Sequence, residues 1–249
     1  MKRTLLLSTI LAVIVGSTPV LAAESVQVPA MAVQVWPEGE PGQMLVVVSA
    51  EIPPGAELPA AVDLPLIEGA ELLWSGEVLG GDPNADIERE GTLVEATGGQ
   101  ALRIGLESGR VAQYEAVTGR LAVDGDEVSG TVRWLQSVRT PVTRFSVRLP
   151  SGAREISVRP AAVLDPRRNR AGELLYTLPD REIEPGDEVS VDVSYRRAAA
   201  VLPASGSGQG GGAGGGSTVL IVVLGAVAAA AGALALMVHR RSTAEQAQP

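Results

Sequence analysis

The segment from Thr218 to Val238 constrains this chain more than any other feature. It contains about 21 residues without a charge, and a helix of that length, at ~1.5 Å per residue, spans a hydrocarbon core of ~30 Å. His239, Arg240 and Arg241 follow directly, and basic residues next to a membrane span favour the cytoplasmic side. We therefore expect a transmembrane helix at 218–238, a cytoplasmic tail at 239–249 and the bulk of the chain outside the cell.

The first 23 residues have the pattern of a secretory signal peptide. Lys2 and Arg3 precede an apolar stretch from Leu5 to Val15, and small residues follow at Ala22 and Ala23. This order of charged, apolar and small residues is typical of a cleaved export signal. We expect residues 1–23 to be removed on export, and the alternative is an uncleaved N-terminal membrane helix.

Residues 202–217 form a Gly/Ser-rich linker that opens with a recognisable pentapeptide: Leu202, Pro203, Ala204, Ser205 and Gly206. This pentapeptide resembles the sortase pattern Leu-Pro-x-Thr-Gly of Gram-positive wall proteins, with Ser205 in the threonine position. A hydrophobic span and an arginine-bearing tail follow it in that family, so the resemblance implies cleavage and attachment to the cell wall. The alternative, which we favour, is a permanent flexible tether of ~20 Å between the exterior and the cell membrane.

The residue types that the exterior lacks exclude several kinds of chemistry. The chain has no cysteine, its one lysine is Lys2 and its one histidine is His239. Catalysis by Ser-His-Asp or Cys-His groups, lysine Schiff bases, and zinc or copper sites built on imidazole or thiolate are therefore excluded outside the membrane. The use of arginine in place of lysine, with much Ala, Gly and Val, is typical of a GC-rich bacterial genome.

Acidic residues are concentrated in the first third of the exterior. Twelve Asp or Glu and no Lys or Arg lie between Glu24 and Glu88, whereas sixteen acids and sixteen arginines lie between Arg89 and Leu202. Such a field repels nucleic acid and attracts cations or a basic partner. We expect no nucleic-acid binding, and the alternative to a functional acidic surface is one that keeps the exported protein soluble.

The exterior is a succession of short strand patterns. Met44–Ile52 has a continuous apolar centre, and the valines at 189, 191 and 193 alternate with polar residues up to Tyr195. Alternation with period two predicts β-strands, and no segment of the exterior sustains the helical period. We expect an all-β, immunoglobulin-like β-sandwich ectodomain.

A partial internal echo suggests two domains. Ala61–Trp74 and Ser146–Ser157 each contain a Leu-Pro followed by a Gly-Ala turn, about 85 residues apart, which is near the size of one small sandwich. We expect an acidic sandwich at 24–115 and a second sandwich at 116–201. One larger sandwich is the alternative.

The most distinctive polar cluster has oxygen-bearing side chains at every second position: Asp82, Asn84, Asp86 and Glu88. This spacing resembles the opening of a calcium loop of the EF-hand or dockerin kind, and the resemblance implies a calcium site. The sequence departs from that loop at Ile87 and Leu93, where the loop has its glycine and its bidentate glutamate. The alternative is an acidic loop between strands.

These observations favour a non-enzymatic role at the cell surface. We expect a membrane-anchored bacterial protein with a binding or structural function, as an accessory subunit or adhesion-like module for another envelope component. Its partner is a protein or an envelope polymer, and the arginines at 167, 168 and 170 are candidates for contact with an anionic polymer. The alternatives are a calcium-dependent surface module, a sortase-anchored wall protein and a glycan hydrolase based on paired carboxylates.

Overall fold

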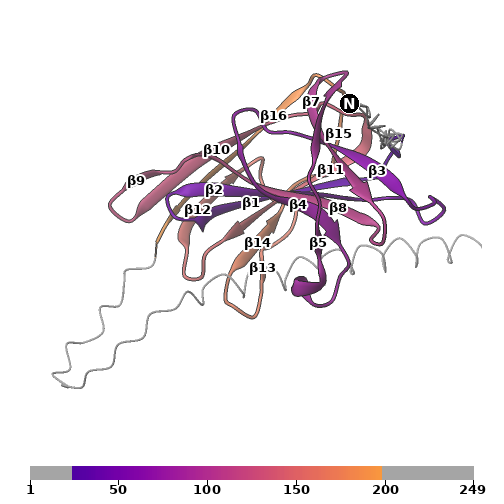
Figure 1. The fold of residues 1–249 in the computed structure, drawn as a ribbon. Coiled ribbons are helices and arrows are strands. Elements are labelled where there is room, and N and C mark those ends of the chain that lie inside the picture. The colour runs from indigo at the N-terminus through magenta and orange to yellow at the C-terminus, as the bar shows by residue number, and fades with distance from the viewer. Residues whose placement is uncertain (1–23, 198–249) are drawn as a thin grey trace, which may run out of the picture.

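The computed structural model describes residues 24–197, which form an all-β fold of three sheets (Figure 1). The helical structure in this part of the chain is one short 3-10 turn, η1 (Pro83–Ala85). None of the described residues belongs to a helix with the length and apolarity needed to cross a bilayer. The expected signal peptide (1–23), linker with its LPASG motif (202–217), membrane helix (218–238) and tail (239–249) lie outside the described residues.

The largest sheet has nine strands, and its neighbours are far apart in sequence. In order across the sheet they are β13 (Arg167–Arg168), β14 (Leu174–Thr177), β11 (Thr140–Leu149), β1 (Met31–Glu40), β2 (Gln43–Glu51), β8 (Val111–Arg120), β4 (Glu71–Val78) and β5 (Ile87–Glu88), and β15 (Arg181–Ile183) also pairs with β11. The pairing of β1 with β11 is parallel, and the other pairs are antiparallel.

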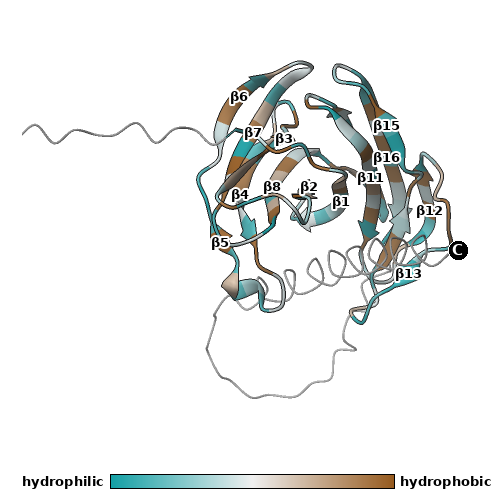
Figure 2. Cartoon of the chain, turned by 90° about the vertical axis from the view of Figure 1, so that its right-hand side faces the viewer, coloured by the Kyte–Doolittle hydropathy of each residue, from teal (hydrophilic) through white to brown (hydrophobic). Residues whose placement is uncertain are grey.

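In the view of Figure 2, the three-stranded sheet lies to the left of β1 and β2 and the four-stranded sheet lies to the right. The four-stranded sheet has the order β12 (Arg154–Arg159), β16 (Glu188–Arg196), β10 (Glu127–Leu135) and β9 (Ala122–Asp124). The three-stranded sheet has the order β3 (Ala60–Pro65), β7 (Gly99–Leu106) and β6 (Thr92–Ala96). The expectation of an all-β architecture is confirmed.

One hydrophobic core joins the three sheets. Trp134 of the four-stranded sheet packs edge-on against Phe145 of β11, with ring centroids 6.1 Å apart. Tyr114 of β8 donates a hydrogen bond of 2.6 Å to the carbonyl of Pro65, at the end of β3. Both contacts belong to a single cluster of buried side chains that extends from Val28 to Tyr195, so the sheets stabilise one another.

This arrangement bears on the expected division into two sandwiches. The boundary at residues 115 and 116 falls in the middle of β8, which pairs with β2 on one side and β4 on the other. The two similar segments, Ala61–Trp74 and Ser146–Ser157, also begin in strands of different sheets. Strand β3 belongs to the three-stranded sheet, and β11 belongs to the nine-stranded sheet. The division into two sandwiches stays a prediction from the sequence.

A second, smaller apolar cluster lies on the other face of the nine-stranded sheet. It consists of Trp36, Leu45, Val47 and Val117, which alternate along β1, β2 and β8 with the side chains of the main core. The Arg148 guanidinium lies 4.0 Å from the centre of the Trp36 ring in a cation–π contact, and it also forms an ion pair with Glu173. Trp36 is therefore packed against the sheet.

Candidate functional site

The candidate site is a polar groove on the outer face of the four-stranded sheet. Strands β10 and β16 bury their valines and turn their serines and threonine outward, as period two requires. The register places Ser157, Ser194, Ser129 and Ala122 side by side in one row across β12, β16, β10 and β9. Because these side chains are small, they leave a hollow of about 460 Å³ above the sheet.

The next row of the same face carries the charges of the groove. Arg159, Asp192 and Thr131 are register partners across β12, β16 and β10, and Arg120 lies beyond them next to β9. Thr131 Oγ1 donates a hydrogen bond of 2.7 Å to Asp192 Oδ1. At ~4.8 Å between strands, the row from Arg159 on β12 to Thr131 on β10 spans about 10 Å.

Two ion pairs lie near the groove, on residues that follow or precede its lining in the chain. Arg154 lies 3.3 Å from Asp126, and Arg196 lies 3.3 Å from Glu155. These side chains are longer than the serines that line the groove.

The groove has the side chains of a binding surface rather than a reaction centre. Its polar lining consists of hydroxyls, two guanidinium groups and one carboxylate, from Arg120, Ser129, Thr131, Ser157, Arg159, Asp192 and Ser194. Hydroxyls donate and accept hydrogen bonds, and guanidinium groups donate in a planar fork. This set suits an extended ligand that carries hydroxyls, amides or anionic groups.

The four residues of the expected calcium site lie in and next to η1, and the carboxylates of Asp82 and Asp86 have other partners. Asp82 Oδ1 accepts hydrogen bonds from the Asn84 backbone at 2.9 Å and the Asn84 side chain at 2.8 Å. Asp86 Oδ1 accepts from Leu79 N at 2.9 Å, and Glu88 belongs to β5. No group of three His, Cys, Asp or Glu within residues 24–197 is arranged to hold a metal ion. The calcium site stays a prediction from the sequence.

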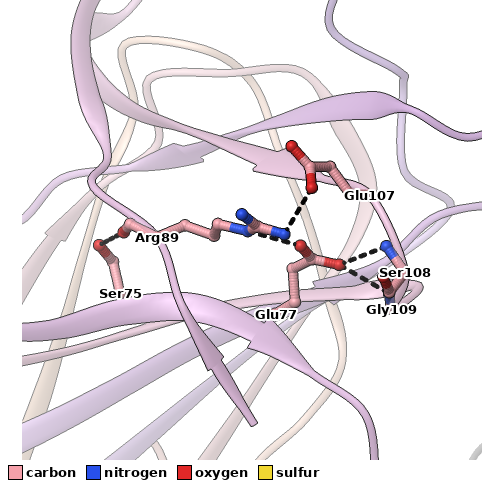
Figure 3. A network of polar contacts seen from close by, with 6 residues as sticks. All are labelled: Ser75, Glu77, Arg89, Glu107, Ser108 and Gly109. Carbon is pink, nitrogen blue, oxygen red and sulfur yellow. Dashed lines mark hydrogen bonds and ion pairs between the residues drawn. The ribbon is translucent and has the colours of Figure 1, made fainter.

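A buried polar network ties this acidic segment to the rest of the fold. Figure 3 shows the Glu77 carboxylate between the Arg89 guanidinium and the turn after β7. Its Oε2 accepts from Ser108 N at 2.8 Å and Gly109 N at 2.6 Å, and its Oε1 accepts from Arg89 Nε at 2.7 Å. Arg89 Nη2 also lies 2.9 Å from Glu107 Oε2. The network therefore joins β4, which carries Glu77, to Arg89 at the end of β5 and to the turn between β7 and β8.

The electrostatics of this network favour the ionised carboxylate. The Glu77 side chain has no exposed area, and its burial acts to raise its pKa. The hydrogen bonds from Gly109, Ser108 and Arg89 outweigh the burial, so the pKa of Glu77 lies below its ordinary value. The same ion pair raises the pKa of Arg89. Glu77 and Arg89 are therefore both charged, and their ion pair stabilises the fold.

Sequence reasoning did not single out the groove or the network. The sequence did contain a pattern that indicates the polar face of the groove. Ser190, Asp192 and Ser194 alternate with valines in β16 and must therefore share one face of the strand. The sequence also contained a pattern for the network, since Arg89 is the first basic residue after the acidic third of the chain. In both cases the partners come from strands that the sequence does not pair.

The comparisons with known proteins give limited information. No family model matches the sequence, and no curated protein matches it. Among solved structures, the mu homology domain of Fcho1 from Danio rerio, with bound Eps15 peptide, is similar over 72% of this chain and 82% of that chain, at 14% sequence identity and a TM-score of 0.23.

Proposed function

We propose that this chain is a membrane-anchored bacterial cell-surface protein whose β-domain binds another envelope component through the groove on the four-stranded sheet. The observation that carries the proposal is the lining of the groove, where small hydroxyl side chains form a floor between Arg120 and Arg159. Sheet faces that serve only to meet solvent do not require small residues aligned in register across four strands. The role is non-enzymatic, and the partner is a protein or an envelope polymer.

The anchor is part of the same proposal. The uncharged run from Thr218 to Val238, with basic residues after it, supports a β-domain held outside the cell membrane on a tether. Attachment to the cell wall after cleavage at the LPASG motif is the alternative. The finer description of the fold as an immunoglobulin-like sandwich also belongs to this proposal.

Photo-crosslinking in living cells tests the proposed function. A photoreactive amino acid in place of Thr131, whose side chain is exposed in the groove, is expected to give one discrete covalent adduct with the native partner. The matched control places the same amino acid at Glu95, which is exposed on β6 of the other small sheet and is expected to give no such adduct.

Two outcomes of this experiment would contradict the proposal. Equal adducts at both positions would mean that the groove has no special role, and the absence of an adduct at Thr131 would mean that it binds no partner in the cell. Extraction of the same membranes with alkaline carbonate checks the anchor independently, because a transmembrane chain stays in the pellet. Material joined to the wall would instead favour the sortase alternative.

A further inference from the structure

The segment that contains β13 and the turn before β14 differs in charge from the rest of the molecule. We call residues 161–172 the arginine hairpin; they include Arg167, Arg168 and Arg170 and one carboxylate, Asp165, in a chain with a net charge of −9. All three arginines are exposed. None of the ion pairs within residues 24–197 involves them, so their charge is open to an anionic partner.

The same hairpin presents apolar side chains to solvent. Val163 is 53% exposed, and Leu164, at 62%, has the largest exposed fraction among the large apolar side chains of residues 24–197. Two adjacent exposed aliphatic residues next to three arginines combine the two contributions that bind a protein to a membrane surface. Apolar side chains enter the headgroup region, and basic side chains are attracted to anionic lipids.

The arginine hairpin is held in an ordered conformation by its own hydrogen bonds. Asn169 Oδ1 accepts from the backbone of Ala171 and of Glu173, both at 3.0 Å. Arg168 Nη1 donates to the Gly172 carbonyl at 2.6 Å, and Val163 N donates to the Thr177 carbonyl at 3.0 Å. Because the segment is already ordered, binding costs little conformational entropy.

The hairpin also lies close to the C-terminal end of the described residues. A Cβ added to Gly172 would stand 2.9 Å from Ser151 Oγ, so the hairpin packs against the turn between β11 and β12. That turn leads to Arg154, whose register partner is Arg196, the last residue of β16. Strands β12 and β13 lie on the same side of the molecule (Figure 2).

We propose that the arginine hairpin docks on the anionic lipid surface of the membrane in which the chain is anchored. The inference rests on the proposed anchor, because the tether keeps the hairpin close to the bilayer, and it adds an orientation of the β-domain. The remaining acidic surface is repelled by the same lipids, so the hairpin side faces the bilayer.

Depth-dependent fluorescence quenching of the full-length chain in vesicles tests this inference. The chain has no cysteine, so Leu164→Cys takes a single environment-sensitive dye, and nitroxide groups on lipid headgroups serve as quenchers. We expect quenching in vesicles of phosphatidylcholine mixed with phosphatidylglycerol to be about twofold or more above that in phosphatidylcholine alone, because each arginine near an anionic surface adds attraction. The matched control is Leu93→Cys, which is 58% exposed on β6 and is expected to show little quenching in either.

The double variant Arg167→Gln with Arg170→Gln, and high salt with the native arginines, are each expected to remove the excess quenching at Leu164. Quenching at Leu164 no greater than at Leu93, or the same with and without phosphatidylglycerol, would overturn the inference. Carbonate extraction of the same vesicles reports the anchor separately. An anchored chain without quenching would thus reject the docking and leave the proposed function standing.

Discussion

Replacing Trp134 by alanine is expected to lower the free energy of unfolding by about 4 kcal/mol, the range found for large aromatic side chains removed from a core. The Trp134 side chain is fully buried, packs edge-on against Phe145 at 6.1 Å and donates from Nε1 to Gln136 Oε1 at 2.8 Å. The substitution leaves a cavity between the four-stranded and nine-stranded sheets. Urea unfolding of the purified chain in a non-ionic detergent, followed by near-ultraviolet circular dichroism, measures the change.

The matched control for this prediction is Trp74→Ala. Trp74 lies on β4 and is only half-buried, so the loss is expected to be about half as large. Because a single core joins the three sheets, we expect one cooperative transition in both variants. Equal losses for the two tryptophans, or separate transitions for the two halves of the chain, would contradict this description of the core.

The variant Glu77→Ala is expected to lose about 3 kcal/mol of stability, because it leaves two backbone N–H groups, one of them on the buried Gly109, and the Arg89 guanidinium without their carboxylate. The two groups are Ser108 N and Gly109 N, at 2.8 and 2.6 Å from the carboxylate. Glu107→Ala removes the other carboxylate that pairs with Arg89, and its side chain is 66% exposed. We expect a loss below about 1 kcal/mol for Glu107→Ala, and equal losses would show that burial of Glu77 adds nothing.

The stabilisation by Glu77 also has a definite pH dependence. Its pKa is lowered in the folded state, so the contribution of the ionised carboxylate is complete above the pKa of the unfolded chain, about 4.3. It disappears as the pH falls through the lower folded pKa. The difference in stability between the native chain and Glu77→Gln is therefore expected to be constant near neutral pH and to shrink in acid. A difference that grows in acid would contradict the assignment.

The strands could be predicted from the sequence because their evidence is local. Alternation of valine with polar residues in β16 fixes which side chains face the core, and the continuous apolar centre of β2 marks a strand buried on both faces. The core positions of Trp134, Phe145 and Tyr195 follow from the same alternation, and all three are buried.

The pairing of the strands could not be predicted, because it depends on partners far apart in the chain. The parallel contact of β1 with β11 joins residues 31–35 to residues 143–147. The repeated Leu-Pro and Gly-Ala signals describe turns and carry no information on which sheet a strand enters.

The groove shows the same limit at the level of a site. Ser129, Ser157 and Ser194 are unremarkable in sequence, and each separately indicates only an outward position on a strand. They become one floor through two registers, β10 with β16 and β12 with β16. The candidate calcium residues had a more conspicuous spacing, yet the carboxylates of Asp82 and Asp86 accept hydrogen bonds within their own turn.

The central claim is that the groove binds the partner, and a blocked groove tests it most directly. Ser194→Trp places an indole in the groove, whereas Ser190→Trp places the same side chain on the same face of β16, outside the groove lining. The measurement is the yield of the photo-adduct from Thr131 in each background. We predict that Ser194→Trp lowers the yield about tenfold, equivalent to ~1.4 kcal/mol of binding, and that Ser190→Trp leaves it unchanged. An equal yield in the two variants would contradict the claim.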